Sequence, residues 1–236
     1  MERIFLLTKE DIKLAVAEVL AVTRTRKYNL DGNKMAVNTN LSFDFLKRLA
    51  YVKKIDGVEL KQKFGLRRPH LKPGFHPTSL NPKLARAMVN LTGIRRGALL
   101  DCFCGVGGIL VEAGLIGLRP VGYDIDEKMV DLAKINLEYY KIKNYKLKVK
   151  DARTLKKKFD YIVADLPYGR ATKDIDKSLY ADFLKVLKKI LGKRAVIGFP
   201  SNVDYKKMIK KEKLRLVDEF DYYLHKSLSK RICIIE

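Results

Sequence analysis

Residues 164–170, ADLPYGR, bring an acidic side chain, a proline and an aromatic ring together directly after a strand-like segment. The carboxylate of Asp165 and the main-chain carbonyl of Leu166 are two acceptors that could bind the hydrogens of one flat exocyclic amine. Pro167 restricts the residue before it to extended conformations, so that this carbonyl is aimed. Tyr168 offers a ring on which a base drawn out of its helix could stack. The set suits transfer of a methyl group to a weakly nucleophilic amino group.

A glycine-rich turn lies earlier in the chain, within ALLDCFCGVGGILVEAG at 98–114. We expect a buried strand, a sharp turn and the start of a helix. Gly105, Gly107 and Gly108 would let the backbone approach a ligand, with helix N–H groups pointing at it. The turn alone is compatible with nucleotide, flavin and adenosylmethionine sites. Asp101 at the strand end would repel a pyrophosphate, and it favours a ligand that carries an ammonium and a sulfonium.

Two more acids end the next two strand-like segments. PVGYDID at 120–126 ends near Asp124, which follows Asp101 by 23 residues. A doubly wound fold places the acceptor for ribose hydroxyls at about this spacing. YKLKVKDA at 145–152 ends near Asp151, a candidate partner for an adenine amino group. Taken singly, each acid could cap a helix or face solvent, but four acids at four successive strand ends predict a cofactor crevice.

The DCFCGVGG, GYDID, KDA and DLPYG segments together resemble the class I adenosylmethionine-dependent methyltransferases, in the branch that modifies amino groups of bases. Residues 4–22, 75–93 and 223–235 are similar to the archaeal tRNA guanosine-N2 methyltransferases that act at position 10. This resemblance implies adenosylmethionine as the cofactor, tRNA as the partner and guanosine N2 as the methyl acceptor. It leaves open whether one or two methyl groups are added.

The resemblance also implies roles for individual residues. The catalytic residues would be Asp165, Leu166, Pro167 and Tyr168. The cofactor would be bound at the strand ends and the glycine turn, by Asp101, Phe103, Cys104, Gly105, Gly107, Gly108, Asp124, Ile125, Asp151, Ala152 and Asp165. Contacts to the base or to phosphates would come from His76, Arg170, Lys226 and Arg231, with His76 as an alternative base. We expect no metal site.

Two departures from the family pattern bear on these expectations. Leu166 stands where the commoner D-P-P-Y motif has its first proline, although its carbonyl remains and Pro167 still follows it. About 70 residues precede FHPTS, enough for a ferredoxin-like segment but not for a THUMP domain, a tRNA-binding module, in addition. We therefore expect a separate THUMP-type or activator subunit to supply that module.

The composition indicates a compact cytoplasmic protein. Its 236 residues, 47% of them hydrophobic, suffice for one catalytic domain and a small appendage, and they exclude wholesale disorder. No apolar run approaches the length of a membrane span, and the charged N-terminus does not resemble a secretory signal. Cys102, Cys104 and Cys233 form neither an even disulfide framework nor a C-x-x-C pair, which points to a reducing compartment and away from zinc.

The net charge of +22 extends along the whole chain. Lysines and arginines exceed acids by 8 in residues 1–75, by 7 in 76–180 and by 7 in 181–236. This distribution suits a surface that follows a folded polyanion such as tRNA. A heat-adapted archaeal surface would also be rich in lysine, and Gln62 is the only glutamine, but such a surface normally balances lysine with glutamate. We expect both factors to contribute.

The chain is predicted to have two parts joined by a linker. Residues 1–62 would form a small α+β, ferredoxin-like region, with a strand at 3–8, a helix at 9–24, a hairpin about Asp31-Gly32 and a second helix at 42–52. Residues 63–74 would be the linker, in which Arg67, Arg68, His70 and Lys72 would either follow phosphates or be solvated. Residues 75–236 would be the catalytic domain.

In the catalytic domain, helical and strand-like patterns alternate, which predicts an α/β fold with a doubly wound, Rossmann-like methyltransferase sheet. The ADLPYGR segment would follow the fourth strand and face the cofactor at the carboxyl ends of the strands. A helix at 180–191 and a strand at 194–201 would come next. Residues 214–228 and 230–236 would close the sheet as an antiparallel hairpin.

The proposed chemistry is direct displacement at the sulfonium by N2 of guanine, with Asp165 orienting the amine. Two other hypotheses stay open at this point. An adenine-N6 methyltransferase on DNA or RNA could use the same motif. A non-catalytic, nucleic-acid-binding subunit could keep the fold; Leu166 and the short N-terminal region favour that hypothesis, whereas the glycine turn and Asp165 favour an enzyme.

Overall fold

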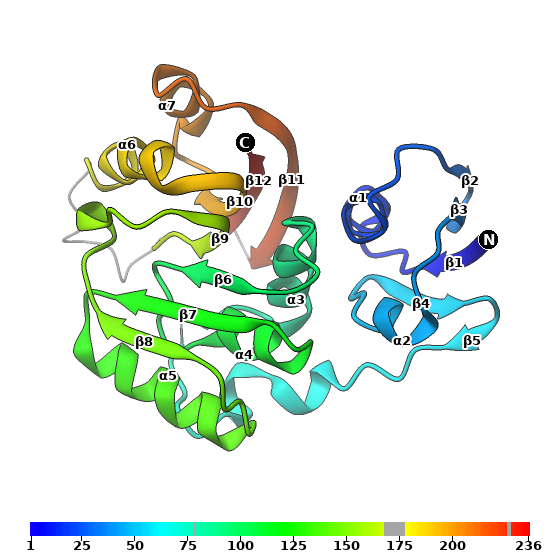
Figure 1. The fold of residues 1–236 in the computed structure, drawn as a ribbon, viewed down its shortest axis with the longest axis horizontal. Helices are drawn as coiled ribbons and strands as arrows, with labels where there is room; N and C mark the ends of the chain where they lie inside the picture. The colour runs from blue at the N-terminus through cyan, green and yellow to red at the C-terminus, as the bar shows by residue number, and fades with distance from the viewer. Residues whose placement is uncertain (78, 168–177, 226–227) are drawn as a thin grey trace.

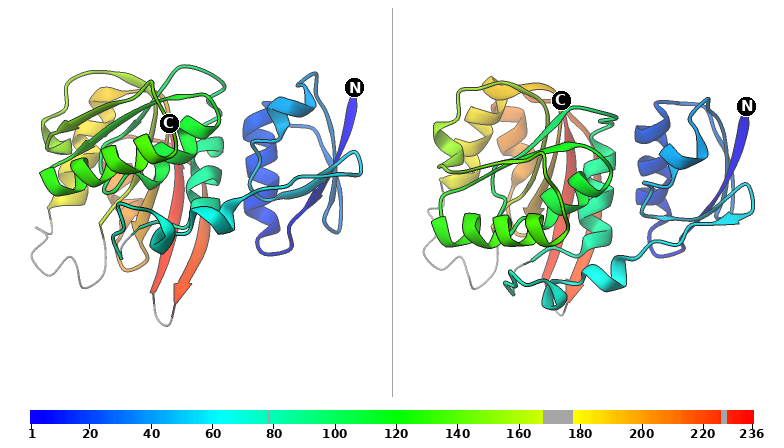
Figure 2. Two further views of the ribbon diagram at one scale, coloured as in Figure 1. Left: turned by 90° about the horizontal axis from the view of Figure 1, so that it is seen from below. Right: turned by 60° about the horizontal axis from the view of Figure 1, so that its bottom comes forward.

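The computed structural model describes residues 1–77, 79–167, 178–225 and 228–236 (Figure 1). Its strands form a five-stranded sheet and a seven-stranded sheet. The smaller sheet belongs to an N-terminal unit that lies beside the larger α/β unit in every view (Figures 1 and 2). Within the described ranges, no helix combines the length and the apolarity needed to cross a bilayer.

The N-terminal unit is an antiparallel sheet with one long helix. Its elements are β1 (Glu2–Leu7), α1 (Ile12–Thr23), β2 (Asn29–Asp31), β3 (Lys34–Asn38), α2 (Phe43–Leu46), β4 (Val52–Ile55) and β5 (Val58–Glu59). The strand order is β2-β3-β1-β4-β5. The predicted hairpin is present, since Asp31 pairs with Lys34 around Gly32, whose φ of +56° suits glycine.

The predicted helix at 42–52 is wrong. Only α2 is helical there, and it ends at Leu46 after a cap in which the Ser42 side chain accepts from the Phe45 N–H. The chain then forms the β4–β5 hairpin about Asp56-Gly57, with Asp56 at φ +50° and Gly57 at φ +83°. Pairing of β4 with β1 supplies hydrogen bonds that a longer helix would have forgone. Tertiary pairing therefore overrides the amphipathic pattern.

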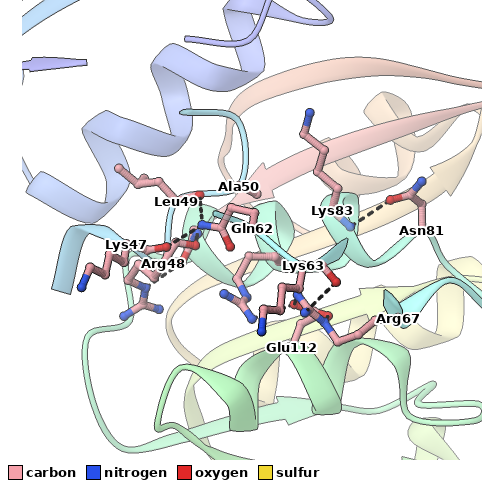
Figure 3. A network of polar contacts seen from close by, with 12 residues as sticks. Lys47, Arg48, Leu49, Ala50, Gln62, Lys63, Arg67, Asn81, Lys83 and Glu112 are labelled. Atoms are coloured by element: carbon pink, nitrogen blue, oxygen red, sulfur yellow. Dashed lines mark hydrogen bonds and ion pairs between the residues drawn. The ribbon is translucent and has the colours of Figure 1, made fainter. Parts of the chain in front are cut away.

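The predicted linker is packed against the catalytic unit. It contains the short turns η1 (Phe64–Arg67) and η2 (Pro69–Leu71). Arg67 donates to the buried Glu112 through Nε at 2.7 Å and through Nη2 at 3.3 Å, and its Nη1 binds the Lys63 carbonyl (Figure 3). Lys72 is buried as well. Arg67 and Lys72 are thus bound within the protein, which corrects the expectation of a solvated or phosphate-following segment at these two positions.

The catalytic unit is a doubly wound α/β fold, as predicted. Its strands are β6 (Ala98–Asp101), β7 (Arg119–Asp124), β8 (Lys146–Val149), β9 (Phe159–Asp165), β10 (Leu191–Pro200), β11 (Leu216–His225) and β12 (Leu228–Ile235). The order is β11-β12-β10-β9-β6-β7-β8. The five strands from β10 to β8 are parallel, and β12 runs antiparallel to both β10 and β11. This is the expected closing hairpin.

Helices cover both faces of this sheet. They are α3 (Pro82–Leu91), α4 (Gly108–Leu115), α5 (Glu127–Tyr139), η3 (Ala152–Thr154), α6 (Leu179–Ile190) and α7 (Tyr205–Lys211). Successive strand residues point to opposite faces. Accordingly Val163, Val196 and Ile232 belong to the core that contains α3, while their neighbours Ile162, Ala195 and Cys233 belong to the core that contains α6 and α7.

The N-terminal unit is attached to α3 through a shared core and a buried polar cluster. Leu14 and Val19 of α1 lie in the same apolar cluster as Leu84 and Met88 of α3. Within this contact the fully buried Glu18 accepts from the Ala50 N–H, the Tyr51 N–H and the Asn90 side-chain amide, at 2.8, 2.8 and 2.7 Å. The Glu18 carboxylate of α1 thereby links the residues that precede β4 to α3.

Candidate active site

The carboxyl ends of the parallel strands border a cavity of about 580 Å³. Most of the residues predicted for a cofactor or for catalysis line it, namely His76, Asp101, Phe103, Cys104, Gly105, Gly108, Asp124, Ile125, Asp151, Ala152, Asp165, Leu166 and Pro167. They come from segments that are distant in sequence and meet because β6, β7 and β9 end at the same edge of the sheet. Ligands of open α/β sheets bind at such an edge.

The glycine turn places main-chain donors beside the cavity. Gly105 has φ +47°, and its N–H donates to Asp124 Oδ2 at 2.8 Å. Gly107, at φ +79°, does not line the cavity. A Cβ there would lie 3.1 Å from the Ala133 Cβ, so the glycine permits close packing of the turn on α5. The turn is therefore built as predicted, but Gly107 acts through packing.

Two acids, at the ends of the neighbouring strands β6 and β7, make this part of the cavity suited to a cationic ligand. Asp101 is 1% exposed, and its Oδ1 accepts from the Phe103 N–H at 3.2 Å. Burial raises the pKa of Asp101 well above its ordinary value, and the nearby Asp124 and Asp165 raise it further. Burial also raises the pKa of Asp124. A cationic ligand in the cavity would favour the ionised form of both acids.

Asp151 is at the cavity but is already engaged. It caps η3, accepting from the Arg153 N–H at 2.8 Å, and it also binds the Arg153 side chain, with Nη2 to Oδ2 at 2.7 Å. These contacts with Arg153 lower the pKa of Asp151. The expected contact with an adenine amino group stays a prediction. Arg153 lines the same cavity, and sequence reasoning did not single it out.

Asp165 ends β9 and forms an ion pair with a lysine that sequence reasoning missed. The Lys230 Nζ lies 2.6 Å from Oδ1 and 2.5 Å from Oδ2. Lys230 is fully buried, on β12. Burial raises the pKa of Asp165 and lowers that of Lys230, and the attraction between the two groups opposes both shifts. The available signal was that Lys230 alternates with Ile232 and Ile234, which places a lysine on an apolar side of the strand.

Leu166 has a function that proline could not supply. Its N–H donates to the Gly198 carbonyl of β10 at 3.0 Å, which continues the β9–β10 ladder past Asp165. Proline has no N–H and would lose this bond. The next carbonyl, that of Pro167, accepts from the Tyr180 hydroxyl at 2.8 Å. The departure from D-P-P-Y therefore ties the segment from Asp165 to Pro167 to the sheet.

Of the residues predicted to bind the substrate, the structure places His76 at the cavity. The His76 carbonyl accepts from the Ser79 N–H and hydroxyl. Arg231 is placed elsewhere: it follows Lys230 on β12, so it points to the opposite face of the sheet, and it forms an ion pair with Asp221 of β11. Arg231 is therefore not among the described residues that line the cavity, and its predicted contact with a base or a phosphate stays a prediction. Tyr168, Arg170 and Lys226 lie outside the described residues.

The cysteines and acids of the described segments do not form a metal centre. Cys102, Cys104 and Cys233 are buried free thiols, and burial raises the pKa of each. Across the described ranges, no three His, Cys, Asp or Glu side chains are grouped as metal ligands would be. The thiols at the glycine turn therefore belong to the packed wall of the site.

Comparison with known proteins places this site in a family. A family model described as "RMKL-like, methyltransferase domain" matches residues 69–230, which include the glycine turn, the strand-end acids and Asp165. The chain belongs to this family. A second model, described as "DNA methylase", matches residues 2–135 and ends before β9.

The chain also resembles curated tRNA methyltransferases. It is 42% identical over 192 residues to the tRNA (guanine(10)-N2)-dimethyltransferase of Pyrococcus abyssi, covering 76% of this chain and 58% of that protein. It is 33% identical over 232 residues to the enzyme of that name from Methanocaldococcus jannaschii, covering 94% and 63%. The chain thus spans little more than half the length of these relatives.

A solved structure supports the fold of this methyltransferase domain. TrmN from Thermus thermophilus superposes with a TM-score of 0.63 at 16% identity, and the match covers 100% of this chain and 99% of that one. At this identity the likeness concerns the fold. It agrees with the doubly wound sheet and with the presence of the smaller N-terminal unit.

Proposed function

We propose that this RMKL-like domain transfers a methyl group from adenosylmethionine to the exocyclic N2 of a guanosine in cytoplasmic tRNA, at position 10. The observation that carries the proposal is the Asp165-Leu166-Pro167 segment at the end of β9, which lines the cavity next to the glycine turn. The names of the curated relatives support the tRNA, the base and its position.

The cavity residues fit adenosylmethionine. The buried Asp101, which has one main-chain donor and a raised pKa, suits the ammonium of the methionine part. Asp124 suits the ribose hydroxyls, and the Asp151-Ala152 turn suits the adenine. The bound cofactor supplies an electrophilic methyl: the lone pair of the amine forms the new N–C bond, the pair of the broken C–S bond stays on sulfur, and the nitrogen loses one proton to water.

The residues of the chain act by orientation. Asp165 accepts a hydrogen bond from the amine and thereby turns the nitrogen lone pair toward the methyl group. Tyr180 holds the Pro167 carbonyl, so the Leu166 carbonyl is the candidate second acceptor for the amine. As positive charge develops on the nitrogen, the Asp165 carboxylate stabilises that charge. It accepts the proton that the nitrogen loses and passes it to water. No covalent intermediate is needed, in keeping with the buried thiols.

Methyl transfer from labelled adenosylmethionine to an unmodified tRNA transcript tests this proposal. We expect incorporation into the transcript with guanosine at position 10 and none when inosine replaces it, because inosine differs by lacking the 2-amino group. N2-methylguanosine, with or without the dimethylated nucleoside, should be found after digestion. Equal incorporation into both transcripts would refute the position. Absence of transfer would refute the activity if it persists with the cofactor bound and with the tRNA-binding module proposed below supplied.

Methylation of an adenine amino group is the second candidate, favoured by the match of residues 2–135 to the DNA methylase model. That match does not include Asp165, whereas the RMKL-like match does. The two candidates differ in product. Digestion of methylated tRNA and DNA, followed by mass spectrometry, separates N2-methylguanosine from N6-methyladenosine, and the second product alone would replace the first proposal.

We also propose that tRNA binding requires a module outside residues 1–236. The proposal rests on the matched relatives, of which the aligned part is 58% and 63% of the length. A THUMP-type domain or an activator subunit would provide it. Affinity for tRNA, measured for this chain alone and with candidate subunits co-purified from its source, tests the idea. Full affinity and turnover by the chain alone would contradict it.

Replacement of Asp124 by alanine should weaken cofactor binding. The variant loses the acceptor for ribose hydroxyls and also the acceptor for the Gly105 N–H. Hydrogen bonds to a charged group contribute about 1.5 to 3 kcal/mol, so we expect the Kd for adenosylmethionine to rise roughly 10- to 150-fold in calorimetry. Asp160→Ala is the matched control, because Asp160 is exposed and pairs with Lys193 away from the cavity. Equal effects would contradict the assignment.

A further inference from the structure

Lys230 reaches the site by crossing a neighbouring strand. It lies on β12 opposite Pro200 of β10, and Asp165 on β9 lies beside Gly198 of β10. The lysine side chain therefore passes over β10 to bring its Nζ within 2.6 Å of both carboxylate oxygens. Sixty-five residues separate the two partners in the sequence. Only the order of the strands brings them together.

Gly198 makes this crossing possible. Val163, Val196 and Ile232 point to the α3 face, so Asp165, Gly198 and Lys230, each two residues away on its strand, point to that face as well. A Cβ on Gly198 would lie 2.8 Å from Asp165 Oδ1, closer than real contacts allow. The glycine leaves open the space through which the ion pair forms. Gly198 thus lies beside Asp165 on the face that the Lys230 side chain crosses.

We propose that Lys230 is a positioning residue that keeps Asp165 ionised and holds both of its oxygens, so that their remaining lone pairs face the amine. This inference rests on the proposed function, since the amine is that of a nucleobase. A buried carboxyl without a cation tends to be neutral. A neutral carboxyl would present an O–H to an amine whose lone pair is needed for attack.

The surrounding charges make the lysine more important. Among the described residues, the other titratable groups that line the cavity are His76, Asp101, Cys102, Cys104, Asp124, Asp126, Asp151 and Arg153. Asp101 and Asp124 are acids in a shared, low-dielectric space, where like charges disfavour one another's ionisation. Arg153 is bound to Asp151. Burial also raises the pKa of Asp165 itself, and Lys230 counters that shift.

The test compares the variants Lys230→Met, Lys230→Gln and Lys230→Arg with the wild type, each as the full chain. Carbon-13 NMR of aspartate labelled at the carboxyl carbon gives the titration midpoint of Asp165, assigned by its loss in Asp165→Asn. Because an opposite charge lowers a carboxyl pKa by about 1 to 3 units, we expect the midpoint to rise by that much in the Met and Gln variants and to stay near the wild-type value in the Arg variant. The acidic limb of the kcat profile on tRNA should move with it, so that activity recovers as the pH rises.

Lys193→Met is the matched control, because it removes a lysine from β10 that pairs with the exposed Asp160. It should move neither the midpoint nor the profile. If both neutral Lys230 variants keep the wild-type midpoint, or lose activity by one factor at every pH, the proposal is overturned. If the wild type methylates no tRNA, the proposed function fails separately. The NMR arm then still decides whether Lys230 keeps Asp165 ionised.

Discussion

Asp165→Asn should abolish most methyl transfer while the cofactor still binds. Asparagine keeps the size of the side chain but replaces one acceptor oxygen with an NH2 donor and removes the charge that stabilises the developing cation. Losses of single preorganised groups of this kind cost roughly 10²- to 10³-fold in kcat, and we expect at least that for this variant. Single-turnover transfer to tRNA measures the rate, and calorimetry measures the Kd for adenosylmethionine.

The same change should also lower the stability of the protein. This effect has to be distinguished from the effect on the rate of methyl transfer. Asparagine leaves the buried Lys230 ammonium without its carboxylate. Removal of one partner from a buried ion pair is strongly destabilising. The double variant Asp165→Asn/Lys230→Met removes both charges, so we expect it to regain stability but not activity. Recovery of transfer in the double variant would show that Asp165 contributes through folding alone.

The parts of this site that could be predicted from the sequence are those fixed by local pattern. Asp101, Asp124 and Asp165 each end an apolar, strand-like run, and parallel strands bring such ends to one edge of a sheet. The φ values of Gly105 and Gly107 follow from the turn that a strand-to-helix connection needs here. Each of these inferences required only residues close together in the chain.

The parts that could not be predicted depend on register and strand order. Lys230 and Arg231 are adjacent cations, and the sequence does not say which of them faces Asp165. Pairing of β12 with β10 sets that choice, and it selects Lys230. The engagement of Asp151 by Arg153 is local, but several nearby lysines compete for it in the sequence. The sequence therefore predicted which acids end the strands, but it did not predict which side chains bind them.

The predicted helix at 42–52 failed for a related reason. Its apolar spacing is compatible with a helix, but Ala50 and Tyr51 instead present their N–H groups to Glu18 of α1. Val52 then enters β4 and pairs beside β1. A carboxylate that is more than thirty residues away in the chain thus fixes the backbone conformation there.

Replacement of Glu18 by alanine should be among the most destabilising single changes in this protein. It leaves the Ala50 N–H, the Tyr51 N–H and the Asn90 amide without their acceptor in a region closed to water. A buried donor left without an acceptor costs about 1 to 3 kcal/mol, so three of them should cost about 3 kcal/mol or more, a large share of the stability of an ordinary domain. Chemical denaturation gives the free energy of unfolding, and hydrogen exchange at the Ala50 and Tyr51 amides reports the local effect.

The matched control for this prediction is Glu10→Ala. Glu10 also joins the N-terminal unit to the catalytic unit, through Lys83 of α3, but its side chain is 65% exposed. Exposed ion pairs contribute about 0 to 1 kcal/mol, so this variant should be nearly as stable as the wild type. Because both glutamates bridge the same two units, a difference between them isolates burial as the cause. Similar losses in both variants would mean that burial of Glu18 among its three donors is not the cause of the loss.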